Sequence, residues 1–448
     1  MILDRSIPPI SKEMPVFNIP PSQKHILSNG LKVLIVQDNS QPLVNIGLSI
    51  PMGAAQEHIP GLGRCVAKLM VMGNSKKNAE EIAQQSDVIG ASFGVSCNWD
   101  STDMNALVLA TYTRDILELM SECLLYSIFP EDEIKRRKQL ILADLEYLSS
   151  DPEYLVSRAC NGTLYENHIY GHSRNGTAST INSIHSEDCK HWHSSLIRTA
   201  GSFFIISGNC DIDAILNMLE EFFGIWKPIN QSILIEKPQF NIGKQLVFAE
   251  KKGAVQTSLQ IAMPSISIYH PDYTLFQICS TIFGGYFASR LNVLLREKHG
   301  YTYGAYSYQD TRKACSSYII QTNIGNEVTR HSVEEILREL QRMNNEPILE
   351  EECTIAAQYL LGSMVQGMET AQQLSGRAKT IESYNLPEDY FTQKFVALSK
   401  ASAHDLFAIQ KQFFAPETLI IAASGDIDIL TEQLSPFGSP QIFTEIDV

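Results

Sequence analysis

The chain has 448 residues, of which 44% are apolar and 19% are charged, and its formal net charge is −15. This length is too great for one ordinary hydrophobic core and predicts two or more domains. The acidic balance argues against a nucleic-acid-binding protein, which needs a basic surface, and no apolar run approaches the ~20 residues that span a bilayer.

The first 24 residues are predicted to form an N-terminal extension. Residues 1–21 contain several Pro and charged residues and no apolar stretch typical of a signal peptide. The nine Cys are spread singly, without a CxxC pair, and many lie in apolar runs such as 123–125. This pattern is typical of reduced core thiols, so we expect a cytoplasmic protein.

Six short apolar stretches predict strands, three in each half of the chain. They are residues 31–36, 44–50, 105–111, 245–249, 258–263 and 318–322. The dipeptide Asn29-Gly30 before the first stretch is typical of a hairpin turn. We expect these strands to pair mainly antiparallel.

The two halves repeat one another, which predicts two homologous domains. Each half closes on an apolar run, then Ser-Gly and an acidic Asp-Ile-Asp end, at 203–213 and at 419–428. Asp213 is expected to cap the helix that follows in the first half. Upstream, the amphipathic patterns at 113–126 and 331–343 predict matching helices, each followed by acidic residues that open a longer helix.

The predicted fold is therefore α+β, with a first domain over 25–226 and a second over 244–448. The segment 227–243 contains Pro and little periodicity, and it is interpreted as the linker between them.

Residues 61–70 read GLGRCVAKLM. This segment resembles the first active-site helix of the insulinase/pitrilysin family of zinc peptidases, whose inverted motif is His, two spacers, Glu, His. In that family the two His bind zinc and the Glu activates a water. Here the three positions hold Arg64, Ala67 and Lys68, so two cations replace the ligands and the base is missing.

The resemblance extends over about residues 25–428. It implies two insulinase-like domains, each a mainly antiparallel sheet with helices packed on one side. It also implies that this chain binds no metal of its own and cannot hydrolyse peptides alone.

Active family members carry a third zinc ligand, a Glu on a later helix, and Asp144 aligns best with it. A short carboxylate without His partners makes a poor zinc site. We expect Asp144 to form an ion pair with Arg64 or Lys68, so that cations of the protein replace the metal.

The segment 90–96 resembles the strand along the family's catalytic cleft. The resemblance makes Ser92, Phe93, Gly94 and Val95 candidates for binding a peptide by strand addition. A plain sheet edge is the alternative interpretation.

Residues 283–304 resemble the family's Arg/Tyr element, which faces the zinc across the closed cleft. By this match Arg296 and Tyr303 are the catalytic pair, since a guanidinium and a phenol can donate to a developing oxyanion. The alternative is a salt-bridged Arg at a helix end and a core Tyr.

The pair His191 and His193 suggests a metal site at first. The two residues lie two apart, so on a helix they point to different sides. A structural or surface role is the better interpretation.

In some bacterial relatives one chain holds zinc and a second supplies Arg and Tyr. This sequence fits the second role, so our hypothesis is the non-catalytic subunit of a heterodimeric zinc peptidase. It implies a homologous zinc-bearing partner, with a homodimer also possible, and a peptide substrate. It implies no cofactor on this chain and neither nucleic acid nor membrane as a partner.

Two alternatives stay open. One is a catalytically dead structural or peptide-binding protein, like the core subunits of some respiratory complexes. The other is hydrolysis at a divergent site of this chain, although no ligand set for it is recognisable.

Overall fold

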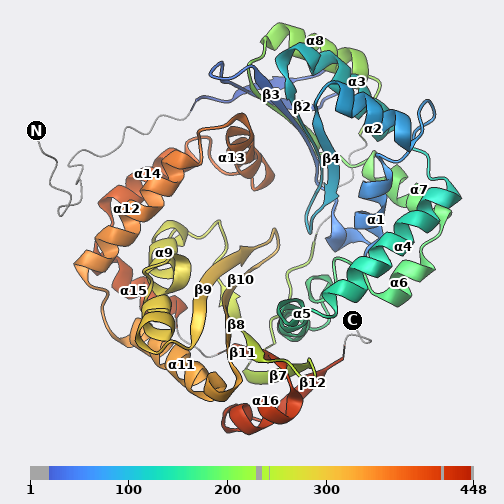
Figure 1. Ribbon diagram of the computed structural model, residues 1–448. Coiled ribbons are helices and arrows are strands. Elements are labelled where there is room, and N and C mark those ends of the chain that lie inside the picture. Colours follow the sequence, from blue (N-terminus) through green and yellow to red (C-terminus); the bar gives the residue numbers. More distant parts are fainter. Residues whose placement is uncertain (1–19, 229–234, 242, 415–417, 445–448) are drawn as a thin grey trace, which may run out of the picture.

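Two six-stranded sheets form the framework of the molecule, one in each half (Figure 1). The computed structural model describes residues 20–228, 235–241, 243–414 and 418–444. The first sheet contains β1 (Gln23–Ile26), β2 (Lys32–Gln37), β3 (Leu43–Ile50), β4 (Ser92–Cys97), β5 (Thr102–Leu109) and β6 (Phe203–Gly208). The second contains β7 (Lys244–Glu250), β8 (Gln256–Ser265), β9 (Thr302–Thr311), β10 (Ser316–Gly325), β11 (Leu419–Gly425) and β12 (Pro440–Phe443).

The two sheets have the same topology over five of their six strands. The first has the order β1-β2-β6-β3-β5-β4 and the second β12-β7-β11-β8-β10-β9. From β2 and β7 onward the strands correspond one to one, and only the β2–β6 and β7–β11 pairs in these stretches are parallel. This confirms the prediction of a repeated α+β fold with mainly antiparallel sheets. The proposed linker, 227–243, lies partly outside the described residues.

Helices of each half cover the outer face of its own sheet (Figure 1). The first half contains α1 (Leu62–Leu69), α2 (Ala79–Val88), α3 (Thr113–Leu125), α4 (Glu131–Leu148), α5 (Pro152–Tyr165), α6 (Ala178–Ser183), α7 (Ser186–Leu196) and α8 (Ile212–Phe223). The second contains α9 (Tyr273–Ser280), α10 (Arg290–Asn292), α11 (Thr329–Asn345), α12 (Glu350–Gln366), α13 (Ala371–Ser383), α14 (Tyr390–Lys400), α15 (Ala403–Phe413) and α16 (Ile427–Leu434), with π-helical segments at Thr281–Gly285 and Val293–Lys298.

Two local expectations need correction. The strand expected at 105–111 is β5, which begins at Thr102 and ends at Leu109, because a 3-10 turn at Ala110–Tyr112 follows it. The cap of α8 is Asp211, whose extended backbone lets its carboxylate accept the N–H of Ala214 at 2.8 Å. Asp213 lies inside the first turn instead, where its charge suits the helix dipole.

The inner face of each sheet is covered by a helix from the other half. Helix α13 of the second half packs on β6 and β3, where Leu374 and Ala378 meet the apolar cluster Leu34, Val36, Phe203 and Ile205. Helix α5 of the first half packs on β11, β8 and β7 through Leu155, Val156, Ala159 and Cys160. Each half therefore contributes one helix that packs on the sheet of the other half, which the sequence did not predict.

A buried Arg at the tip of the β9–β10 hairpin fastens the two halves together. The guanidinium of Arg312 lies 4.7–4.8 Å from the ring centroids of Trp99, Tyr165 and Tyr170, all from the first half. It pairs with Asp310 at 2.8 Å and donates to the carbonyl oxygen of Tyr170 at 3.0 Å. Aromatic faces and a carboxylate together compensate for taking this charge out of water.

One helical run, Tyr273–Lys298, is long and apolar enough by length and composition to cross a membrane. Of its most apolar window, 61% is buried inside the protein, where α9 contributes to the core of the second half. Buried core helices commonly meet this criterion, so the run is weak support for a membrane span. It does qualify the expectation that no apolar run approaches that length.

Candidate functional site

Helix α1 carries the positions that the resemblance assigns to zinc. A left-handed glycine, Gly61 (φ +90°), precedes the helix, and the buried carboxylate of Glu57 accepts the N–H groups of Gly61 and Gly63, each at 2.9 Å. Burial raises the pKa of Glu57 to about 7, although the two N–H donors oppose the rise. The start of α1 is thus fixed by a carboxylate held in the core.

The two cations of α1 lie one turn apart and are both half-buried. Arg64 lies 3.6 Å from the carboxylate of Asp144 on α4 and donates to Asn175 Oδ1 at 2.6 Å. The expected ion pair with Asp144 is therefore confirmed for Arg64. The side chain of Asp144 is 54% exposed, so its ion pair with Arg64 is weakly stabilising. Lys68 forms no ion pair in the described part of the chain.

These residues do not fit a zinc ion. Arg64 and Lys68 bring positive charge to the ligand positions, and Ala67 is only 2% exposed within the core of the first half. Across the described ranges, no group of three or more His, Cys, Asp or Glu side chains is arranged to hold a metal. His193, one of the two suspected ligands, is buried with Nε2 2.7 Å from the carbonyl oxygen of Leu124.

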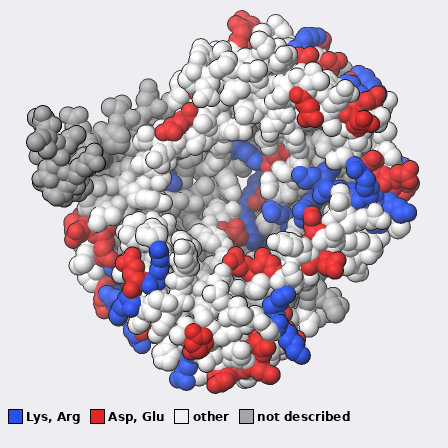
Figure 2. Space-filling model, in the orientation of Figure 1, with Lys and Arg blue, Asp and Glu red and all other residues white. Residues whose placement is uncertain are grey.

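Two further arginines join the cations of α1. Arg137 on α4 has a buried Nε without a hydrogen-bond partner. Burial lowers the pKa of Arg137, and the charge of Arg64 lowers it further. Burial also lowers the pKa of Arg174, again with a contribution from Arg64. We call Arg64, Lys68, Arg137 and Arg174 the cation cluster; Figure 2 shows Lys and Arg gathered where α1 and α4 lie.

Strand β4 forms the free edge of the first sheet, as expected for a peptide-binding strand. Among the strands of the described ranges it pairs only with β5, through the register Ser92↔Leu107 to Cys97↔Thr102. Ser92 is exposed, Phe93 and Gly94 are half-buried and Val95 is buried, and a Cβ at Gly94 would meet no atom within 4 Å. The outer backbone of β4 is therefore open to an added strand, and its last residues lie against α1.

Arg296 and Tyr303 lie side by side at the corresponding edge of the second sheet. Tyr303 is 93% exposed, and the guanidinium of Arg296 lies 5.6 Å from its ring centroid and 4.4 Å from that of Phe287. Within the described residues Arg296 has no carboxylate partner. The alternative of a salt-bridged Arg and a core Tyr does not match these positions.

A β-bulge in β9 includes Tyr303. Between the pairs Ala305↔Thr322 and Thr302↔Ile324, β9 advances three residues while β10 advances two. Tyr303 and Gly304 therefore share one opposing residue, Asn323. Such a bulge redirects a side chain without ending the strand.

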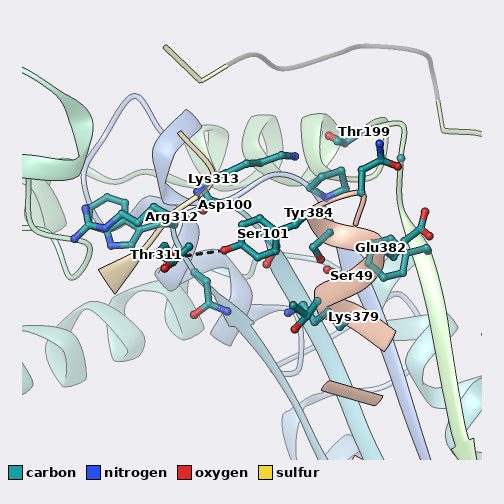
Figure 3. A pocket seen from close by; sticks show the side chains of 18 of the residues that line it. Ser49, Asp100, Ser101, Thr199, Thr311, Arg312, Lys313, Lys379, Glu382 and Tyr384 are labelled. Atoms are coloured by element: carbon teal, nitrogen blue, oxygen red, sulfur yellow. Dashed lines mark hydrogen bonds between the residues drawn. The ribbon is translucent and has the colours of Figure 1, made fainter. Parts of the chain in front are cut away.

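A cavity of about 670 Å³ lies between the two halves (Figure 3). Lys379 of α13 reaches Asp103 at 2.6 Å, and this carboxylate also accepts from Ser49 and Ser101. Lys32 pairs with Glu382 at 2.5 Å. Of the residues assigned a role from sequence, none lines this cavity; Arg174, which the sequence did not single out, connects it to the cation cluster.

Two family models match consecutive parts of the chain. The model described as Insulinase (Peptidase family M16) matches residues 32–178, and the model described as Peptidase M16 inactive domain matches residues 183–360. The chain belongs to the insulinase family. This confirms the family that the motif around Arg64 indicated.

Curated relatives are distant. A protein of Bacillus subtilis named uncharacterized zinc protease YmxG is 22% identical over 79% of this chain and 86% of its own length. The probable mitochondrial-processing peptidase subunit beta of Schizosaccharomyces pombe is 19% identical over 72% and 75%. Insulinase-family relatives of this chain thus include proteins named as zinc proteases and as a peptidase subunit.

Solved structures confirm the fold. The peptidase M16 inactive domain from Pseudomonas fluorescens has a TM-score of 0.84 at 23% identity, covering 90% of this chain and 98% of that one. A chain of complex III2 from Candida albicans has a TM-score of 0.74 at 14% identity, covering 93% and 98%. At these identities the likeness extends to the fold alone.

Proposed function

We propose that this chain is the non-catalytic subunit of a two-subunit insulinase-family zinc peptidase. It supplies Arg296 and Tyr303 to a peptide held at the zinc site of a homologous partner. The observation that carries the proposal is the pairing of these two side chains: they are adjacent at a sheet edge, Tyr303 is exposed and Arg296 is half-buried. Within the described residues neither side chain has a hydrogen-bond acceptor or a carboxylate partner, so both donors are available to a group that another molecule brings.

The chemistry of the pair suits peptide hydrolysis. The guanidinium of Arg296 and the phenol of Tyr303 would donate hydrogen bonds to a peptide carbonyl oxygen as it gains negative charge. Phe287 packs against the guanidinium and limits its movement. The metal belongs to the partner in this proposal, because the residues at 64, 67 and 68 do not fit zinc.

The chain is proposed to act in the cytoplasm. All nine Cys are free thiols and eight of them are buried, which supports a reducing compartment. A homodimer of this chain is a further possible state, and the size of the purified protein distinguishes it from a heterodimer.

The test is peptide hydrolysis by this chain, by a homologue with an intact zinc motif from the same genome, and by their equimolar mixture. We expect activity in the mixture, and we expect Arg296→Ala or Tyr303→Phe to lower kcat by about 10²–10³-fold. Zinc content is measured on each chain separately and is expected only on the homologue.

Two matched controls separate the pair from general surface effects. Tyr306→Phe changes another exposed phenol of β9, and Arg338→Ala removes an exposed Arg of α11; both are expected to leave kcat unchanged. Full activity of the mixture with Tyr303→Phe contradicts the proposal. No activity in any mixture favours a structural or peptide-binding protein without catalysis.

A further inference from the structure

The cation cluster holds an excess of positive charge next to an open strand edge. Arg64, Lys68 and Arg137 are partly withdrawn from water, and Asp144 is the one carboxylate in ion-pair contact with any of the three in the described part of the chain. Asp144 itself is half exposed. The local charge is therefore opposite in sign to the net charge of the whole chain.

Neighbouring like charges repel one another. Burial is the main cause that lowers the pKa of Arg137, and the charge of Arg64 lowers it further. The buried Nε of Arg137 has no hydrogen-bond acceptor. A buried donor without an acceptor is unfavourable, so an anion that enters the cluster supplies an acceptor and relieves the repulsion.

The neighbouring strand indicates how such an anion arrives. The N-terminal part of α1 packs against the end of β4, where a Cβ at Gly63 would lie 2.7 Å from Cys97 Sγ. Arg174 also reaches this end of the strand, donating to Asn98 Oδ1 at 3.4 Å. A peptide paired along the outer edge of β4 would therefore pass beside the cation cluster.

We propose that the cation cluster binds a carboxylate of a peptide that lies extended along β4. The guanidinium groups of Arg64 and Arg137 present planar forks that match a carboxylate, and Lys68 adds a third charge. The carboxylate is either an Asp or Glu side chain or the C-terminus of the peptide. From the proposed function this inference takes only that the chain binds peptides.

The test measures peptide affinity on the whole chain alone, without a zinc-bearing partner. The probes are fluorescent peptides of about ten residues, long enough to pair along the six residues of β4. One has internal Glu residues and an amidated C-terminus, a second replaces Glu by Gln, and a third is the Gln peptide with a free C-terminal carboxylate. The second peptide is the neutral reference. The first tests a side-chain carboxylate, and the third tests the C-terminal carboxylate.

We expect at least one carboxylate peptide to bind about tenfold more tightly than the neutral peptide at low salt. This preference is expected to shrink as the salt concentration rises, because part of the cluster is exposed. Lys68→Gln and Arg137→Gln should each reduce the preference, and the Arg64→Gln/Lys68→Gln double variant should abolish it.

Arg136→Gln is the matched control. Arg136 neighbours Arg137 on α4, but its side chain is 57% exposed and pairs with Glu133 at 3.0 Å. This variant is expected to keep the full preference. Thermal unfolding checks that each variant is folded. Lys68→Gln keeps the test valid if the Arg64 variant fails to fold, because Lys68 forms no ion pair with any residue that the structure describes.

Equal affinity for charged and neutral peptides would overturn the inference, as would a preference that survives Lys68→Gln and Arg137→Gln. A chain that binds none of the peptides would also overturn it. The outcome is separable from the proposed function, since Arg296→Ala is expected to lower kcat with a partner by about 10²–10³-fold and to leave the carboxylate preference unchanged.

Discussion

At the scale of single residues, the positions that correspond to the family's zinc motif make other contacts in this chain. Ala67 packs in the core, Arg64 bonds to Asn175 and approaches Asp144, and Lys68 stays half-buried on the same side. A Glu at position 67 would place a carboxylate among apolar side chains. The loss of the motif is thus built into the packing of α1 and does not leave an empty metal site.

Glu57 allows a prediction about pH. Its folded pKa of about 7 lies above its ordinary value near 4.5, so between these pH values the folded protein keeps a proton that the unfolded chain releases. The stabilisation is fully present below pH 4.5 and is lost as the pH rises to about 7. We expect the free energy of unfolding, relative to Glu57→Gln, to fall by about 3 kcal/mol over this range.

Chemical denaturation of both proteins at several pH values measures this difference. The comparison removes the contribution of groups that titrate alike in both proteins, including the buried His193. The amide of the variant cannot ionise but keeps one acceptor oxygen for the N–H groups of Gly61 and Gly63. A difference that stays constant from pH 4.5 to pH 7 contradicts the prediction.

At the scale of elements, α13 and α5 decide the packing of the inner sheet faces. The α13 contact is both apolar and polar: Leu374 and Ala378 meet the sheet, while Ser375 contacts Asn45 at 2.8 Å and Ser207 at 2.6 Å. Buried hydroxyl and amide groups that satisfy one another fix the position of the helix along the strands.

Leu374→Ala tests this packing. The residue is 3% exposed against the first sheet, so truncation leaves a cavity and is expected to lower the free energy of unfolding by about 2–5 kcal/mol. Gln372→Ala, at an exposed position of the same helix, is the control and is expected to change it by less than about 0.5 kcal/mol. Equal effects of the two substitutions would mean that α13 is not held by this contact.

At the scale of the whole molecule, the exchange of α5 and α13 makes the halves depend on each other. Separated fragments 1–226 and 244–448 would each expose an apolar sheet face and an apolar helix face. The first would also lose Arg312 from among Trp99, Tyr165 and Tyr170. We expect each fragment alone to associate and to bind a hydrophobic dye, and the co-expressed fragments to form one soluble complex.

Size-exclusion chromatography and dye fluorescence on the two fragments, alone and together, measure this dependence. Co-expressed fragments carrying Leu374→Asp should fail to associate, while fragments carrying Gln372→Asp should associate normally. A fragment that is monomeric, binds no dye and unfolds cooperatively by itself would show that the exchanged helix is dispensable.

Sequence patterns determined the family, the repeat and most strands of this protein, because periodicity and short motifs are local. The substitutions at 64, 67 and 68 are visible in the chain itself, and so is the spacing of Arg296 and Tyr303. Element boundaries differ from the patterns: β5 starts earlier than its apolar run, and Asp211 caps α8 in place of Asp213.

Only the tertiary structure decided which surfaces meet. A continuous apolar strand such as β6 indicates that both of its faces are buried. The pattern does not identify α13 as the helix that covers one face, because that helix lies far away in the sequence. The sequence likewise did not predict that Arg137 lies near Arg64 or that Arg312 lies among aromatic side chains, because these contacts join residues that are far apart in the chain. Charge and burial at a site depend on every chain segment that converges there, whereas periodicity reports only on the segment that carries it.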